Sequence, residues 1–331
     1  MCKSLRGVIA LWLPIGAIGQ TFALFPKQSS FPSVSQPIAG TLVELFEPAK
    51  EIAVTLPPHI TLNDGNTIPR LGLGVWRLSD EEAPRLVGDA IDAGYRHIDT
   101  AEAYQNEAGV GQGLKRTKTR RRDIWVTSKL QTSLQGYDST MRAFDQTMAK
   151  LELDQLDLFL VHWPAPGRDK YVETWKAFIE LQQQGRIRSI GVSNFLPEHL
   201  ERIIGETGIT PAVNQIELHP RFQQAASRDW HQQHGIVTES YSPLGGKGTK
   251  LLEDPVITGI AKRHGKSLAQ IIIRWHLQLD LVVLPKSSKL ERAVDNLDVW
   301  DFELTQEDMS AIAGLDRPDG KTLPHPNELN D

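Results

Sequence analysis

The sequence predicts a (β/α)₈ barrel, in which eight parallel strands alternate with eight helices. Three observations support this prediction. Short apolar runs alternate eight times with longer amphipathic segments between Leu71 and Leu297. The alternation covers the roughly 250 residues that one such barrel usually needs. A Gly-x-Gly-x-x-Gly motif does not follow the first apolar run, which argues against an open, doubly wound sheet.

Each repeating unit is expected to consist of one strand and one helix. A hairpin comes first, because Asp64-Gly65 separates the short runs His59–Leu62 and Thr67–Pro69 and tolerates a positive φ. The first strand, Leu71–Trp76, precedes a helix over residues 80–93 that Gly94 ends. The later strands and helices are expected at His97–Asp99 and 106–116, Ile124–Ser128 and 139–151, Leu156–Val161 and 173–184, Ile187–Val192 and 197–205, Ala212–Ile216 and 225–234, Ile236–Ser240 and 267–279, and Val282–Leu284 and 290–297.

One unit carries an insertion between its strand and its helix, over residues 243–265. We expect a long loop here that serves as a lid rather than as a hinge between domains. Residues 54–331 are therefore expected to form a single barrel domain, whose bottom is closed by the N-terminal hairpin.

The first 53 residues differ in character from the rest. Lys3 and Arg6 precede an apolar stretch, Val8–Ile18, so this segment loosely resembles a secretory signal. A proline and a glycine interrupt the apolar stretch, and it is shorter than the roughly 20 residues of a membrane-spanning helix. Three interpretations of residues 1–53 remain open: an unstructured leader or over-long start, a signal or anchor, and a segment docked on the fold.

Charge and cysteine content exclude several classes of protein. The formal net charge of −5, without a long run of Lys or Arg, argues against general nucleic-acid binding. The basic cluster at residues 115–122 is interpreted as a solvated helix end and turn. Cys2 is the single cysteine, so neither an intrachain disulfide nor a cysteine-based metal site can form. We expect a cytoplasmic protein without stable membrane association, although the signal-like segment leaves export or anchoring open.

Polar or ionisable side chains stand at the carboxyl ends of seven consecutive predicted strands. In a parallel barrel these ends gather at one mouth, where function is located. Each residue alone has an ordinary structural explanation, such as a core histidine or a packing tyrosine, but their coincidence predicts one site. In chain order the residues are Asp99, Lys129, His162, Ser193 and Asn194, Gln215, Tyr241 and Ser242, and Lys286 and Ser287.

The chemistry that Asp99, Tyr104, Lys129 and His162 indicate is proton transfer to an oxygen. Tyr104 shares one strand-to-helix loop with Asp99. A phenol is a poor acid at neutral pH, and we expect the Lys129 ammonium to stabilise its anion and lower its pKa. Asp99 would keep Lys129 charged, and His162 would donate a hydrogen bond to a substrate carbonyl. Metal catalysis is disfavoured, because one Asp and one His form an incomplete set of ligands.

From residue 59 to residue 331 the sequence closely resembles the aldo-keto reductase superfamily. The segment 94–106 resembles the family's signature loop, with Asp99 and Tyr104 at the catalytic aspartate and tyrosine. Lys129 and His162 match the lysine and histidine that complete the catalytic tetrad. Further strand ends resemble family motifs: Gly191-Val192-Ser193-Asn194-Phe195, Asn214-Gln215-Ile216-Glu217, Tyr241-Ser242-Pro243-Leu244-Gly245 and Pro285-Lys286-Ser287-Ser288.

The resemblance implies a barrel that binds NADPH in an extended form and transfers its hydride to an aldehyde or ketone, while Tyr104 protonates the forming alkoxide. It implies contacts to the nicotinamide, to the pyrophosphate and to the adenosine with its 2′-phosphate. Two cations at the 2′-phosphate favour NADPH over NADH. The residues implied at the nicotinamide are Ser193, Asn194, Gln215 and the ring-stacking Tyr241. Those at the pyrophosphate are Ser242, Leu244 and Gly245, and those at the adenosine and its 2′-phosphate are Lys286, Ser287, Arg292 and Asn296.

Within the family, the short tail with Pro324-His325-Pro326 and the motif at residues 296–299 look most like prokaryotic reductases of the 2,5-diketo-D-gluconate reductase type. Trp76, Trp163, the insertion and the tail would shape the substrate pocket together with the catalytic tyrosine and histidine. We therefore expect a monomer that reduces a keto-sugar acid or a small reactive carbonyl. The alternative is a sensor that binds the cofactor as a redox-state ligand, but all four tetrad positions are filled, which favours the enzyme.

Overall fold

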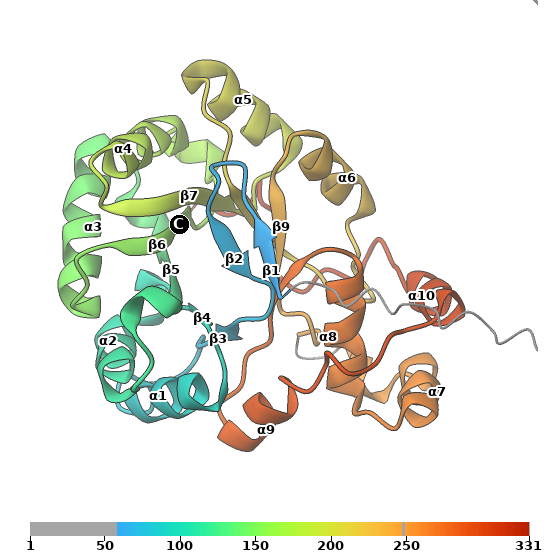
Figure 1. Ribbon diagram of the computed structural model, residues 1–331. Helices are drawn as coiled ribbons and strands as arrows, with labels where there is room; N and C mark the ends of the chain where they lie inside the picture. Colours follow the sequence, from blue (N-terminus) through green and yellow to red (C-terminus); the bar gives the residue numbers. More distant parts are fainter. Residues whose placement is uncertain (1–57, 247–248, 331) are drawn as a thin grey trace, which may run out of the picture. The chain divides into compact units, whose positions relative to one another are not determined.

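The computed structural model describes residues 58–246 and 249–330, which contain the barrel (Figure 1). Its 8-stranded sheet is parallel and follows the order of the sequence. Parallel bridges from Leu71 to Val283 and from Gly74 to Lys286 join the first strand to the last and close the barrel. The strands are β3 (Leu73–Gly74), β4 (His97–Asp99), β5 (Trp125–Leu130), β6 (Leu156–Val161), β7 (Ile187–Ser193), β8 (Val213–Glu217), β9 (Val237–Tyr241) and β10 (Val282–Leu284).

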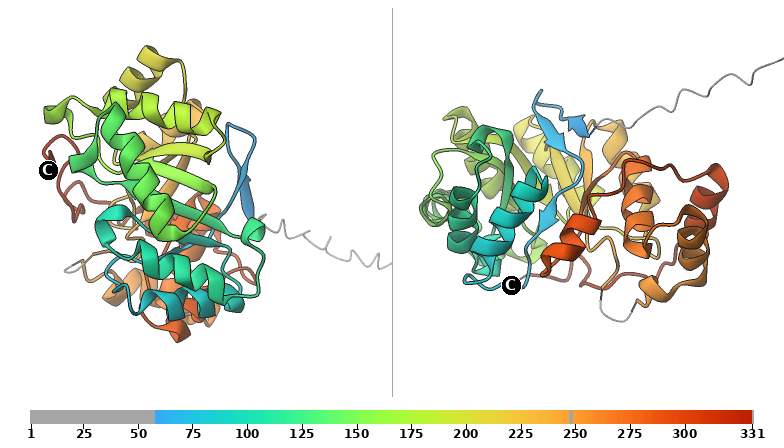
Figure 2. Two further views of the ribbon diagram at one scale, coloured as in Figure 1. Left: turned by 90° about the vertical axis from the view of Figure 1, so that its left-hand side faces the viewer. Right: turned by 60° about the horizontal axis from the view of Figure 1, so that its bottom comes forward.

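Helices surround these strands and confirm the predicted (β/α)₈ fold (Figure 2). Most of these helices bury apolar side chains in the core. In α4, for example, Phe178 stacks on Phe159 of β6 with ring centroids 4.6 Å apart. The helices at the predicted positions are α1 (Ala83–Ala93), α2 (Glu107–Arg116), α3 (Tyr137–Leu151), α4 (Tyr171–Gln183), α5 (Pro197–Thr207), α6 (Ala225–Gln233), α8 (Leu268–Gln278) and α9 (Leu290–Asp295).

The predicted hairpin is present, with β1 (His59–Thr61) antiparallel to β2 (Thr67–Pro69) (Figure 1). Its turn places side-chain amides at the amino-terminal ends of the barrel strands. Asn63 donates a hydrogen bond to the carbonyl of Pro211, just before β8, and Asn66 donates to that of Arg188 at the start of β7. The hairpin therefore covers the bottom of the barrel, as predicted.

Some strand boundaries differ from the prediction. Lys129 lies inside β5 rather than after it, because ladder pairing to β6 continues through Leu130. The first strand is regular only over Leu73–Gly74, whereas Leu71–Trp76 was predicted. Beyond Gly74 the backbone turns, since Arg77 adopts a φ of 61°. This turn carries Trp76 out to the barrel mouth.

The insertion lies where it was predicted, between β9 and α8, and it contains a helix that was not predicted, α7 (Pro255–His264). Asp254 caps this helix by accepting a hydrogen bond from the Val256 amide at 2.9 Å. Ile257 and Ile260 are buried in a core cluster shared with α8. A second unpredicted helix, α10 (Gln306–Ala313), begins with a capping box at Thr305. Both helices carry start signals that sequence analysis overlooked.

Residues 1–53, for which three interpretations are open, lie outside the described residues. Within the described ranges, no helix is both long and apolar enough to cross a membrane. The same ranges contain no cluster of three or more His, Cys, Asp or Glu side chains placed to hold a metal ion.

Candidate active site

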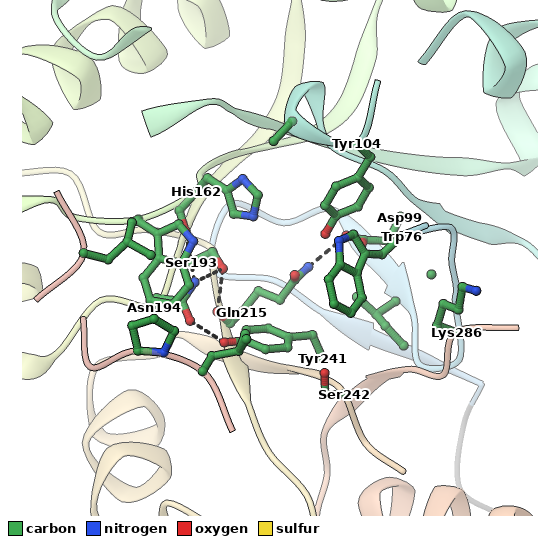
Figure 3. Close-up of a pocket in the computed structure, with 17 residues that line it drawn as sticks. Trp76, Asp99, Tyr104, His162, Ser193, Asn194, Gln215, Tyr241, Ser242 and Lys286 are labelled. Atoms are coloured by element: carbon green, nitrogen blue, oxygen red, sulfur yellow. Dashed lines mark hydrogen bonds between the residues drawn. The ribbon is translucent and has the colours of Figure 1, made fainter. Parts of the chain in front are cut away.

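A cavity of about 310 Å³ opens at the carboxyl ends of the strands (Figure 3). Apolar and aromatic side chains form most of its wall, and the C-terminal tail contributes Leu323, Pro324 and Leu329. The structure therefore brings together predicted residues that lie far apart in the sequence. Those that line the cavity are Trp76, Asp99, Tyr104, His162, Trp163, Ser193, Asn194, Gln215, Tyr241, Ser242 and Lys286.

Lys129 and Asp99 form a buried ion pair beside this cavity. Lys129 Nζ donates to both carboxylate oxygens of Asp99 at 2.7 Å and to the carbonyl oxygen of Thr100 at 2.9 Å. Burial acts to lower the pKa of Lys129, but Asp99 acts in the opposite direction, and the net pKa is raised. The ammonium is therefore charged and held in one position.

Tyr104 ends a short 3₁₀ helix, Glu102–Tyr104, in the loop after β4. The centroid of its ring lies 5.1 Å from Lys129 Nζ and 6.1 Å from the centroid of the His162 ring. Burial raises the pKa of Tyr104 by more than Lys129 lowers it, so the net pKa is raised. The prediction of a lowered pKa is therefore wrong. Lys129 acts in the predicted direction, but loss of water around the phenol outweighs it.

The loop that carries Tyr104 is fixed by the fully buried side chain of Asn106. Its amide nitrogen donates to the carbonyl oxygens of Val75 and Leu78 at 3.0 and 3.1 Å. Its oxygen accepts a hydrogen bond from the Thr100 hydroxyl at 2.7 Å. Asn106 thus ties the loops after β3 and β4 together and holds Tyr104 at the cavity.

His162 follows β6 and faces the cavity beside Tyr104 (Figure 3). Burial, and to a lesser extent the charge of Lys129, lowers the pKa of His162 to about 3. The imidazole is therefore neutral near pH 7, with one ring nitrogen as donor and the other as acceptor. The His162 carbonyl oxygen accepts a hydrogen bond from Asn194 Nδ2 at 3.0 Å, which ties the ends of β6 and β7 together.

A cluster of neutral polar groups lines the cavity at the ends of β7, β8 and β9. The Ser193 hydroxyl donates to the carbonyl oxygen of Gln215 at 2.8 Å. The Tyr241 hydroxyl donates to Asn194 Oδ1 at 2.8 Å. Asn194 has a φ of 62°, a left-handed conformation that asparagine tolerates better than most residues. These contacts fix the orientation of groups that can bind an amide ligand.

Glu239, which contacts Gln215 of the cavity wall, and His97 beside it are buried ionisable residues that sequence analysis missed. Gln215 Nε2 donates to Glu239 Oε2 at 2.7 Å and to Asp99 Oδ2 at 2.9 Å, which leaves its carbonyl oxygen for a ligand. His97 Nε2 lies 3.7 Å from Glu239 Oε1. Burial, assisted by Asp99, raises the pKa of Glu239 to about 8. A charged residue inside a predicted buried strand was the signal that could have revealed it.

A second cavity, of about 470 Å³, lies beyond the loop after β9. Lys286 lines both cavities, and Arg292 adds a second cation to the lining of the second one. Gly245 lines neither cavity; with a φ of 76° it forms the turn of the loop after β9. The remaining predicted residues that line the second cavity are Leu244, Ser287, Arg292 and Asn296.

The comparisons with known proteins agree with this geometry. The model of the aldo/keto reductase family matches residues 70–317, and the chain belongs to this family. The chain is 55% identical to an aldo-keto reductase of Mycolicibacterium smegmatis, over 83% of this chain and 99% of that protein. It is 48% identical to the methylglyoxal reductase DkgA of Escherichia coli, over 82% of this chain and 98% of that protein.

A solved structure is similar to this chain in both fold and sequence. A variant of Gox0644 in complex with NADPH has a TM-score of 0.79 and 49% sequence identity, covering 82% of this chain and 98% of that chain. As a member of the family, the chain is an NADP(H)-dependent oxidoreductase that acts on carbonyl groups. The resemblance stated from the sequence is confirmed.

Proposed function

We propose that the protein reduces small aldehydes and ketones with NADPH, and that Tyr104 is the general acid. The arrangement of Lys129 carries this proposal. Its ammonium is held by Asp99 and lies 5.1 Å from the centroid of the Tyr104 ring, where it can stabilise the phenolate that remains after proton transfer. Small reactive carbonyls and keto-sugar acids are the proposed substrates, in keeping with the similarity to a methylglyoxal reductase.

We place the cofactor across the two cavities that Lys286 lines. Gln215, Ser193 and Asn194 would offer amide and hydroxyl groups to the nicotinamide amide, and Tyr241 would offer a ring for the nicotinamide to stack on. Lys286 and Arg292 would provide positive charge for the 2′-phosphate. When bound, NADPH supplies the hydride.

The protein's own residues then control the proton. The raised pKa of Tyr104 keeps the phenol protonated, which is the state that a general acid needs. Neutral His162 donates a hydrogen bond that orients the carbonyl oxygen toward Tyr104. As the oxygen gains negative charge, Tyr104 transfers its proton to that oxygen, and Lys129 stabilises the resulting phenolate. Asp99 acts indirectly, by keeping Lys129 charged and in place.

The test is to follow NADPH oxidation by its absorbance with methylglyoxal, other small aldehydes and keto-sugar acids. We expect turnover of at least one of these carbonyls. Tight NADPH binding without turnover of any of them would instead support the sensor interpretation.

We further propose that residues 54–331 act as an independent, monomeric catalytic domain. A variant that lacks residues 1–53 should retain the kcat/KM of the full chain and elute as a monomer in size-exclusion chromatography. Loss of activity in that variant would show that the first segment contributes to the domain.

A further inference from the structure

The C-terminal tail, residues 316–330, returns across the barrel mouth after α10. Three of its apolar side chains, Leu323, Pro324 and Leu329, line the cavity that holds Tyr104 and His162. The tail has no helix or strand of its own. Contacts with the barrel must therefore determine where this part of the cavity wall lies.

Glu217, the last residue of β8, makes the most extensive of these contacts. The Thr322 amide donates to Glu217 Oε1 at 2.9 Å, and the Leu323 amide donates to Oε2 at 3.2 Å. The Thr322 hydroxyl also donates to Oε1. Glu217 is 3% exposed, and His219 Nε2 lies 3.5 Å from its Oε1. A carboxylate so deeply buried needs such donors, and most of them come from the tail.

The same tail residue also packs against the loop after β9. At Gly246 a Cβ atom would lie 2.8 Å from the Thr322 hydroxyl oxygen, which is too close for any other residue without a shift. Thr322 therefore lies between Glu217 and Gly246. The tail therefore packs against the loop after β9 at this one position, which lines neither cavity.

The far end of the tail is held by weaker hydrogen bonds that are exposed to solvent. Asn330 Oδ1 accepts a hydrogen bond from the Gly167 amide at 2.8 Å, and Asn327 Nδ2 donates to Glu198 Oε1 at 3.3 Å. Both contacts are exposed to solvent. Exposed hydrogen bonds compete with water and contribute little, so the buried carboxylate is the stronger attachment.

We propose that Glu217 is a positioning residue that sets carbonyl selectivity, because it holds Leu323 and Pro324 as an apolar wall of the substrate pocket. This proposal rests on the proposed function of the cavity. The wall favours carbonyls with a compact side group over bulky ones. Glu217 does not touch the reacting atoms; it acts through the backbone amides of the tail.

The test compares Glu217→Ala with Glu217→Gln and with Glu198→Ala, which removes the exposed carboxylate that contacts the same tail. NADPH affinity is measured by fluorescence, and kcat and KM are measured for a small and a bulky aldehyde. We expect Glu217→Ala to raise the KM of the small aldehyde about tenfold, to leave NADPH affinity unchanged and to shift kcat/KM toward the bulky aldehyde. The KM and the selectivity of Glu217→Gln should lie between those of Glu217→Ala and the wild type. Glu198→Ala should match the wild type in both.

Equal selectivity in Glu217→Ala and the wild type, or a parallel loss of NADPH affinity, would overturn the proposal. If Glu217→Ala does not fold, Thr322→Val removes one donor and Leu323→Ala removes part of the wall, and both should shift selectivity in the same direction. Unchanged selectivity in these two variants would also overturn it.

Anchoring itself is measured by hydrogen exchange at the Thr322 and Leu323 amides, which does not depend on catalysis. These amides should be protected in the wild type and should exchange rapidly in Glu217→Ala. Fast exchange in the wild type would contradict the anchoring. Absence of turnover in the wild type with protected amides would instead count against the proposed reductase chemistry.

Discussion

Lys129 Nζ lies 2.7 Å from each carboxylate oxygen of Asp99, on neighbouring strands of the barrel, and the lysine side chain is fully buried. Removing either partner would leave the other charge buried and unpaired, which typically costs about 3–5 kcal/mol. The pair is therefore a structural as well as a chemical unit. For this reason, the most informative variants of the site change the residues around the pair.

Tyr104→Phe should reduce kcat by about 10²–10⁴-fold, the usual contribution of a general acid, because the variant has no proton to transfer. NADPH affinity should stay nearly unchanged, since the ring remains in place. Stopped-flow turnover and fluorescence titration measure the two quantities. Tyr137→Phe, at an exposed tyrosine on α3, is the matched control. Retained turnover in Tyr104→Phe would refute the assignment of the acid.

His162 should make the protein less stable at acidic pH. Its pKa falls from 6.5 to about 3 on folding, so the unfolded chain binds the proton more readily throughout that interval. Stability therefore falls as the pH drops below 6.5, by about 2 kcal/mol for this residue at pH 5. In urea unfolding, the free energy of unfolding of His162→Gln should fall less between pH 7 and pH 5 than that of the wild type. His59→Gln, in the exposed hairpin, should behave as the wild type; equal losses in all three would contradict the prediction.

Glu239 should have the opposite pH dependence. Its pKa rises from 4.5 to about 8 on folding, so between these values the folded protein keeps a proton that the unfolded chain has released. Stability then falls as the pH rises through this interval, by about 1.4 kcal/mol per pH unit at most. Glu239→Gln, which cannot ionise, should gain stability relative to the wild type from pH 5 to pH 8. Parallel stability curves for the two proteins would exclude this role.

Arg292→Ala should weaken NADPH binding far more than NADH binding, because the removed cation is assigned to the 2′-phosphate. Lys289→Ala is the control, since Lys289 is an exposed cation nearby that does not line the second cavity. Dissociation constants for both cofactors, measured at one salt concentration, are the readout. Equal losses for NADPH and NADH would contradict the assignment.

Much of the fold could be predicted because a parallel barrel repeats one pattern. Strands His97–Asp99, Leu156–Val161 and Val282–Leu284 begin and end at the predicted residues, since apolar runs with sharp polar ends define them. The boundary at Lys129 was missed because ladder pairing, which a single sequence does not display, continues past the apolar run. Helix α7 was missed although Asp254 and Pro255 signal its start.

The residues that gather at the cavity were predicted, but the net direction of the pKa shift of Tyr104 was not. The gathering of Asp99, Tyr104 and His162 at one cavity follows from their positions at strand ends, although their catalytic roles stay predictions. The pKa of Tyr104 could not be predicted, because it depends on how much burial opposes Lys129. Glu239 and the tail contact at Glu217 depend on residues from distant segments, and only the folded chain brings those segments together.

The closure of the barrel has a consequence for biosynthesis. The bridges from Leu71 to Val283 and from Gly74 to Lys286 join the first barrel strand to the last. While the chain is still being translated, the outer edge of β3 therefore lacks its partner until β10 has left the ribosome. Contacts so distant in sequence also slow folding. The barrel can thus close only after nearly all of its strands have been made.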